Sequence, residues 1–316
     1  MAKLDRNPTV FCMSVTPFTT DDRVDEQGLR GHLRRLVAVG CGVYLGSGGS
    51  GEGHALSLEE LEKLYSIGVE ECKGKVPTYA NPREARSAKQ MLEVCHIAHK
   101  AGIEVVQLYP LDGGHGMKPT VAEQELYYRD LLDNISYPVS VSIHPMAVGY
   151  TTPPPLIEKL VRDYKQIVAL NVMAGQPMSV FVQFRDKAWA VRPSIKLYTS
   201  MSSVLECMMQ GASGCLATEP NIAPRLSKQV LDLFMAGELE RAGETMNHLL
   251  RLNSMLGRIS PTAGPARGIK AAMQVLGVPG GNGNLRRPYL PLPEKERNEI
   301  AAELEAMGLK KLEGLP

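Results

Sequence analysis

The chain has 316 residues, of which 44% are hydrophobic and 22% are charged, a composition typical of a globular protein. Its 35 Lys and Arg residues balance 34 Asp and Glu residues to a net charge of +1, which argues against nucleic acid or an anionic membrane as a partner. No apolar run approaches the roughly 18 residues that span a bilayer, and the first ten residues lack the core of a signal peptide. We therefore expect a cytoplasmic protein, in which the six scattered cysteines are buried free thiols.

Short β-type runs alternate with longer helical runs along most of the chain. The β-type runs cover residues 9–17, 42–47, 76–81, 104–110, 138–145, 167–173, 194–200 and 213–219. Helices are predicted from Ser57, which forms a capping-box pattern with Glu60, and over 84–101, 120–134, 153–164 and 201–210. Eight successive strand–helix units predict a parallel sheet with right-handed crossovers, and eight strands close a barrel.

The strand signal stops after residue 220, and residues 223–277 and 293–308 have helical periodicity. The predicted fold class is therefore α/β, a (β/α)8 TIM barrel with a C-terminal helical extension. We expect the barrel over residues 1–222 and the C-terminal helices over 223–316, packed on the barrel as a single structural unit.

Two neighbouring strands of this barrel carry polar residues near their carboxyl ends, where the active sites of such barrels form. Alternation in the fifth strand puts three apolar residues on one face and Ser140, Ser142 and His144 on the other. The polar set should face the barrel axis. In the sixth strand the same argument directs Asn171 inward, beside Ser142. Each of these residues also has a simpler explanation as a satisfied core polar group.

The loop after the second strand reads GSGGSGEGHALS, residues 46–57. Its glycines allow backbone conformations that are closed to other residues, and consecutive amides in such a loop can bind a carboxylate or phosphate. A tight turn before the helix at Ser57 explains the glycines equally well. The loop lacks the Gly-Lys-Ser/Thr of a P-loop.

Taken together, these segments resemble the dihydrodipicolinate synthase / N-acetylneuraminate lyase family of pyruvate-dependent class I aldolases. The resemblance covers nearly the whole chain. It rests on the order of several motifs: SVTPF at 14–18, GGSGEGHALSLEE at 48–60, GKVPTYA at 74–80, Pro138 to Gly149, GASG at 211–214, GIKAAMQVLG at 268–277 and RRPYLPLP at 286–293.

The resemblance implies that a lysine on the sixth strand forms a Schiff base with pyruvate, that a tyrosine on the fifth strand moves protons, and that the glycine-rich loop binds the carboxylate. In this sequence Asn171 falls on the lysine position and Ser142 on the tyrosine position. Ala147 stands where the synthases carry an arginine, and Leu111-Asp112 replaces a tyrosine pair.

No other lysine is a good replacement for the missing one. Lys165 and Lys196 belong to the opposite end of the barrel, Lys270 lies in a late helix, and Lys118 lies on a solvent-facing loop. An amide cannot form an imine, so the usual Schiff-base mechanism is not expected.

Three hypotheses follow for function. The first is a lyase-family enzyme with altered chemistry that binds a small keto acid or other carboxylate, with no cofactor and no metal. Its catalytic residues would be His144, Asn171 and Ser142, and its substrate-binding residues Gly49, Ser50, Gly51, Glu52 and Asp112. The second is a catalytically inactive binding or regulatory homologue. In either case the resemblance implies a homodimer or homotetramer.

The third hypothesis is a metal-dependent aldolase or hydrolase. It would use His144, His54, His115, Glu52 or Asp112, but these residues show no short metal-ligand spacing.

Overall fold

Eight parallel strands close into a barrel in chain order, as the sequence predicted. The computed structural model describes residues 7–172, 178–261 and 264–316. The strands are β1 (Thr9–Met13), β2 (Gly42–Leu45), β3 (Thr78–Ala80), β4 (Val105–Leu108), β5 (Val139–Ile143), β6 (Ile167–Val172), β7 (Lys196–Ser200) and β8 (Gly214–Ala217). Residue 173, the expected end of the sixth strand, and Gly175 lie outside the described residues.

Helices alternate with these strands and then continue alone. The α-helices before and between the strands are α1 (Glu26–Val39), α2 (Leu58–Cys72), α3 (Ala88–Lys100), α4 (Val121–Leu132), α5 (Pro145–Val148), α6 (Pro154–Asp163), α7 (Met178–Val191) and α8 (Val204–Met209). The C-terminal helices are α9 (Pro224–Met235), α10 (Leu239–Ile259), α11 (Gly264–Leu276), α12 (Glu294–Ala306) and α13 (Leu309–Glu313). Short 3-10 turns are η1 (Gly53–Ala55), η2 (Met201–Ser203) and η3 (Glu219–Asn221). The predicted C-terminal helical extension is thus confirmed.

Side-chain caps set several helix boundaries. The capping box at the start of α2 is confirmed, because Ser57 accepts a hydrogen bond from the amide of Glu60 and Glu60 accepts one from the amide of Ser57. The expected start of the third helix at residue 84 is wrong. Ser87 caps α3 by accepting from the amide of Gln90, so the helix begins at Ala88. Helices α1 and α7 were not among the predicted ones, although Asp25 is an N-cap residue for α1.

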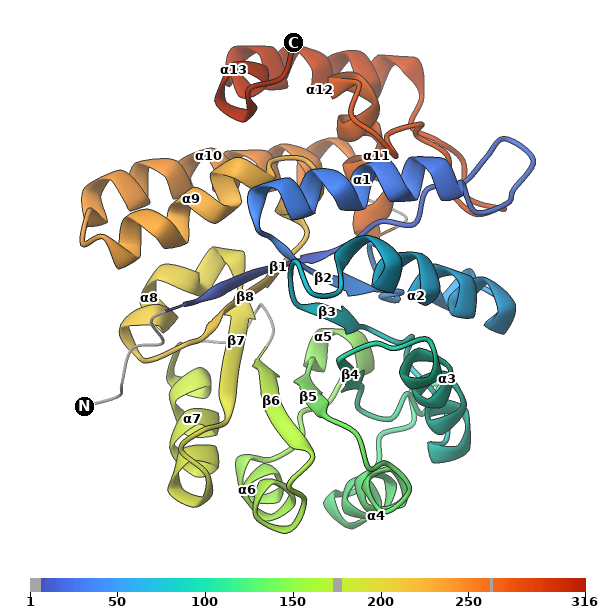
Figure 1. Ribbon diagram of the computed structural model, residues 1–316, viewed down its shortest axis with the longest axis vertical. Helices are drawn as coiled ribbons and strands as arrows, with labels where there is room; N and C mark the ends of the chain where they lie inside the picture. The colour runs from blue at the N-terminus through green and yellow to red at the C-terminus, as the bar shows by residue number, and fades with distance from the viewer. Residues whose placement is uncertain (1–6, 173–177, 262–263) are drawn as a thin grey trace. The chain divides into compact units, whose positions relative to one another are not determined.

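The residues divide into two compact units. Unit 1 comprises the chain up to Thr9 and Tyr79–Leu216, and unit 2 comprises Val10–Thr78 and Ala217–Pro316. In unit 1, helices α3, α4, α6 and α7 lie outside the strands (Figure 1). In unit 2, α9 and α10 run side by side, and α9 packs with α1 (Figure 1). These units differ from the expected division into a barrel over residues 1–222 and C-terminal helices over 223–316. The expected division stays a prediction.

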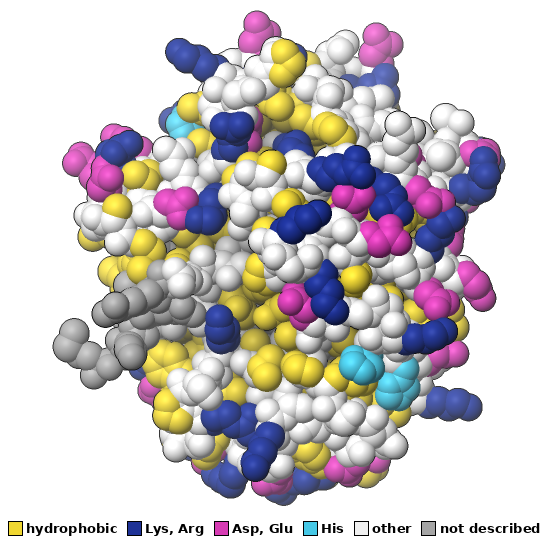
Figure 2. All heavy atoms as spheres, in the orientation of Figure 1, with side chains coloured by type: hydrophobic (Ala, Val, Ile, Leu, Met, Phe, Trp, Pro, Cys, Tyr) yellow, Lys and Arg dark blue, Asp and Glu magenta, His cyan; other side chains and the backbone are white. Residues whose placement is uncertain are grey.

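All six cysteines are buried and free, as predicted. In the part of the chain that the structure describes, no helix is both long and apolar enough to cross a membrane. Basic and acidic side chains are interspersed on the face shown in Figure 2, in keeping with the net charge of +1.

Candidate functional site

In unit 1, Asn171 belongs to a buried row of polar side chains that crosses three strands. Its amide Nδ2 donates to Gln107 Oε1 on β4 and to Ser140 Oγ on β5, the latter at 3.4 Å. Gln107 in turn donates from Nε2 to Asn81 Oδ1 at 2.5 Å. Because β5 pairs with both β4 and β6, these bonds require all three side chains to lie on one face of the strands. The Asn171 amide is therefore held by its neighbours.

Ser142 lies next to Asn171, as the alternation argument predicted. The two residues are register partners in the β5–β6 pair, and both are fully buried. No group in the described part of the chain hydrogen-bonds to Ser142 Oγ. A buried hydroxyl without a protein partner indicates a position where a ligand or water can bind.

His144 follows β5 and caps the short helix α5. Its Nδ1 accepts a hydrogen bond from the amide of Ala147 at 3.1 Å, so the proton of the neutral ring must be on Nε2. The ring is half-buried, and its centroid lies 6.3 Å from that of Tyr109. Burial lowers the pKa of His144 below its usual value. The side chain is therefore neutral near pH 7, with Nε2–H as a donor.

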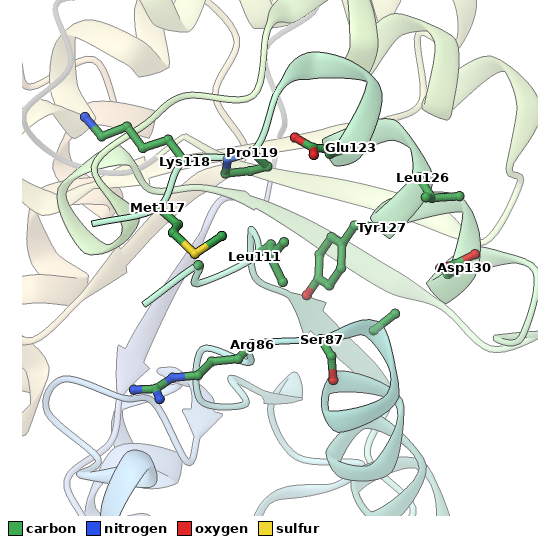
Figure 3. A pocket seen from close by; sticks show the side chains of 12 residues that line it. Arg86, Ser87, Leu111, Met117, Lys118, Pro119, Glu123, Leu126, Tyr127 and Asp130 are labelled. Carbon is green, nitrogen blue, oxygen red and sulfur yellow. The ribbon is translucent and has the colours of Figure 1, made fainter. Parts of the chain in front are cut away.

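Asp112 lies in the loop after β4, where its carboxylate accepts from the amide of Gly114 at 3.0 Å. Near it, a cavity of about 330 Å³ opens between the N-terminus of α3 and helix α4. Figure 3 shows Leu111, Met117 and Tyr127 between Arg86 on one side and Lys118 on the other. None of the residues predicted to be catalytic or substrate-binding lines this cavity. The substrate-binding role of Asp112 stays a prediction.

In unit 2, the glycine-rich loop is held in shape by its own hydroxyl groups. Ser47 Oγ accepts from the amide of Gly51 at 2.9 Å, and Ser50 Oγ donates to the carbonyl of Met13 at 2.7 Å. A Cβ at Gly51 would lie 2.8 Å from the backbone nitrogen of Ser47, and one at Gly53 would lie 1.9 Å from the carbonyl oxygen of Gly46. Glycine is therefore required at both positions for steric reasons.

The amides of Gly48, Gly49 and Ser50 are the part of this loop with binding capacity. No group of the described residues accepts a hydrogen bond from any of the three. Ser50 is only 2% exposed, and a buried N–H needs an acceptor. Consecutive amides of this kind can bind an anion.

Glu52 ties this loop to the C-terminal helices. Its Oε1 pairs with Lys270 Nζ on α11 at 2.5 Å, and its Oε2 accepts from the amide of Arg286 at 2.9 Å. Lys270 also donates to the carbonyl of Asn284, and its ammonium lies 4.3 Å from the ring centre of Phe18. Both carboxylate oxygens of Glu52 are thus used within the chain, which favours the structural explanation of this residue.

Lys270 is completely buried. Burial lowers its pKa to about 8, against the opposing effect of Glu52. An amine that is enclosed and ion-paired is a poor replacement for the lysine expected on β6.

Each of the two loop histidines is exposed in its own loop. The ring of His54 is exposed and its Nδ1 donates to the carbonyl of Gly48 at 2.8 Å, while His115 is exposed at a positive φ of 46°. Over residues 7–172, 178–261 and 264–316, no three His, Cys, Asp or Glu side chains lie close enough to hold a metal ion.

Sequence reasoning missed Gln107 and Asn81, which hold Asn171. The signal was present, since Gln107 interrupts an apolar strand and Asn81 ends the preceding one. Reasoning from the sequence also missed Glu219, a buried carboxyl after β8.

Comparison with known proteins gives one consistent answer. Residues 8–307 match the model of the Dihydrodipicolinate synthetase family. The 4-hydroxy-tetrahydrodipicolinate synthase of Methanopyrus kandleri is 27% identical over 305 residues, 96% of this chain and 95% of that protein. The enzyme of the same name from Chlorobium phaeovibrioides is 25% identical over 93% of this chain and 95% of its own.

Solved structures agree on the fold. YagE of Escherichia coli K12, a family protein crystallised with pyruvate, superposes with a TM-score of 0.86 at 19% identity, covering 96% of this chain and 99% of its own. A dihydrodipicolinate synthase variant described as monomeric gives a TM-score of 0.85 at 20% identity, covering 97% of this chain and 98% of its own.

Proposed function

Because the chain belongs to the dihydrodipicolinate synthetase family, we propose that it binds a small keto acid or other carboxylate through the loop at residues 46–53, without forming a Schiff base. The proposed reaction class is a carbon–carbon or carbon–oxygen lyase. One observation carries the proposal. The backbone N–H groups of Gly48, Gly49 and Ser50 donate no hydrogen bond to any described group.

A carboxylate is the ligand that suits these amides best. It offers two anionic oxygens, and hydrogen bonds to a charged acceptor are shorter and about twice as strong as neutral ones. The loop is also preorganised by the bonds of Ser47, Ser50 and Glu52, so little ordering is required when the ligand binds.

The chemistry of Asn171 supports a mechanism without a Schiff base. An imine requires a primary amine, and the nitrogen of an amide is not nucleophilic because its lone pair is delocalised. Here that nitrogen also donates to Gln107 and Ser140. In the neutral ring of His144 the proton is on Nε2, because Nδ1 accepts from the amide of Ala147, so this side chain is suited to donate a hydrogen bond to a ligand.

The test combines binding with chemical trapping. Pyruvate is titrated by calorimetry, and the mixture is then treated with borohydride and analysed by mass spectrometry, with a class I pyruvate aldolase as the positive control. We expect saturable binding and no pyruvyl adduct. A stoichiometric adduct on a single lysine would reject the mechanism, and absence of binding would reject the role of the loop.

A catalytically inactive homologue is the second candidate. The observation in its favour is the row formed by Asn171, Gln107 and Asn81, in which the amide that replaces the reactive group bonds to other side chains. Saturable binding without turnover of any keto acid in a substrate panel would support it. The expected homodimer or homotetramer stays a prediction, which light scattering at micromolar concentration would check.

A further inference from the structure

We propose that a second cavity, in unit 2, binds an uncharged group that donates hydrogen bonds, such as a hydroxyl, and that Glu219 is the positioning residue that sets this preference. The inference rests on the proposed function, since it assigns the part of the ligand that extends beyond the carboxylate.

The cavity has a volume of about 340 Å³ and lies between the end of β8, helix α10 and the start of α11. Its polar lining comes from Thr218, Asn253 and Ser260, and its apolar lining includes Leu256, Pro265 and Ile269. The lining residues that the structure describes include no charged side chain. A site with this lining has no counter-charge for a second carboxylate.

One residue of the glycine-rich loop, Gly49, lies close to a residue that lines this cavity. A Cβ on Gly49 would lie 3.5 Å from Cγ of Pro265, and Pro265 is one of the lining residues. Gly49 carries one of the three amides assigned to the carboxylate. The loop and the cavity therefore share Pro265 as a neighbour.

Glu219 hydrogen-bonds to Thr218 and Asn253, two of the polar residues that line the cavity. Its Oε1 accepts from Asn253 Nδ2 at 2.5 Å, and its Oε2 accepts from the Thr218 amide at 2.9 Å and from Thr218 Oγ1 at 3.5 Å. Glu219 is 5% exposed, and no ion pair among the described residues includes it. Burial raises the pKa of Glu219, and these hydrogen bonds oppose the rise because they favour the charged form.

These hydrogen bonds determine which polar atoms of Asn253 and Thr218 face the cavity. A carboxylate only accepts hydrogen bonds, so the NH₂ end of Asn253 and the hydroxyl proton of Thr218 must point toward it. Asn253 Oδ1, to which no described group donates, and the lone pairs of Thr218 Oγ1 are left for a ligand. Two acceptors in front of a buried carboxylate favour a ligand that donates and disfavour an anion.

Three six-carbon acids separate the possibilities. Gluconate carries hydroxyls, hexanoate carries none, and adipate carries a second carboxylate. We expect gluconate to bind about tenfold more tightly than either of the others by calorimetry, as two added neutral hydrogen bonds would give. Pyruvate, which carries no hydroxyl group, is titrated in parallel to measure the loop alone.

The variants test the role of Glu219. In Glu219→Gln the new amide can donate to Asn253 Oδ1, so Asn253 can turn its NH₂ toward the cavity. The gluconate-to-adipate ratio should then fall about tenfold while pyruvate affinity changes less than twofold. Asn253→Leu should abolish the preference, and Asn247→Leu, an exposed asparagine on the same helix, should leave it unchanged.

Each outcome decides one of the two proposals. If pyruvate binds but gluconate and hexanoate bind alike, the cavity assignment is rejected and the proposed function stands. Gluconate preference that depends on Glu219, without pyruvate binding, rejects the role of the loop and keeps the cavity. If none of the four acids binds, both are rejected.

Discussion

Removal of one partner from the buried pair of Glu52 and Lys270 should strongly destabilise unit 2. The side chains of Glu52 and Lys270 are 5% and 0% exposed, and the two charged atoms lie 2.5 Å apart. In Lys270→Met the carboxylate would remain buried with only the Arg286 amide as a donor. Breaking a buried ion pair on one side costs about 3–5 kcal/mol. For a chain of this size, that corresponds to a fall in Tm of roughly 6–10 °C.

Calorimetric or circular-dichroism melting would measure this effect in a double-mutant cycle with Glu52→Gln. The double variant should be less destabilised than Lys270→Met alone, because it buries no uncompensated charge. Lys228→Met is the matched control, since Lys228 pairs with Asp232 on the surface of α9 and such pairs contribute about 0–1 kcal/mol. A loss below about 1 kcal/mol in Lys270→Met would refute the reasoning, because it would mean that the carboxylate finds water or another partner.

Two further predictions concern unit 2. Stability should decrease as the pH falls from about 6.5 toward 3. Burial, and to a smaller extent Arg35, lowers the pKa of His32 in the folded chain to about 3, so in this window the unfolded chain binds a proton that the folded chain does not. The free energy of unfolding should therefore fall by up to about 1.4 kcal/mol per pH unit. Denaturant titrations of His32→Gln at several pH values should show a shallower slope, and an unchanged slope would contradict this assignment. Gly53→Ala should weaken pyruvate binding at least tenfold, because the added Cβ would collide with the carbonyl of Gly46. The control is Gly243→Ala on α10, where an added Cβ meets no atom within 4 Å. This variant should bind pyruvate normally in the same calorimetric assay.

The barrel could be predicted from the sequence because its signals are local. Runs of β-type residues bounded by turns recur eight times, and the capping box at Ser57 and Glu60 depends on residues three apart. The start of the third helix was missed because a serine cap at Ser87 determines it, and the periodicity extends past that cap. Alternation also sufficed to put Ser142 beside Asn171, since a strand has a period of two.

The partners of the site residues could not be predicted in the same way. Glu52 contacts Lys270 and the Arg286 amide across more than 200 residues of sequence, and no local pattern encodes such a pair. The orientation of Asn253 by Glu219 likewise depends on how α10 packs after β8. Sequence reasoning identified which residue types were unusual, and packing determines what each of them contacts.

Unit 2 is built from two segments that are far apart in the sequence, and this has a consequence for its folding during synthesis. Its first segment, Val10–Thr78, is translated before the whole of Tyr79–Leu216, and only then does the second segment follow. At about 5–20 residues per second, the ribosome leaves the first segment without its partners for on the order of ten seconds. During that interval His32 lacks Asn221, and Glu52 lacks Lys270. The apolar faces of α1 and α2 are then open to chaperones or to other nascent chains, which makes this early segment the stretch where misassembly would begin.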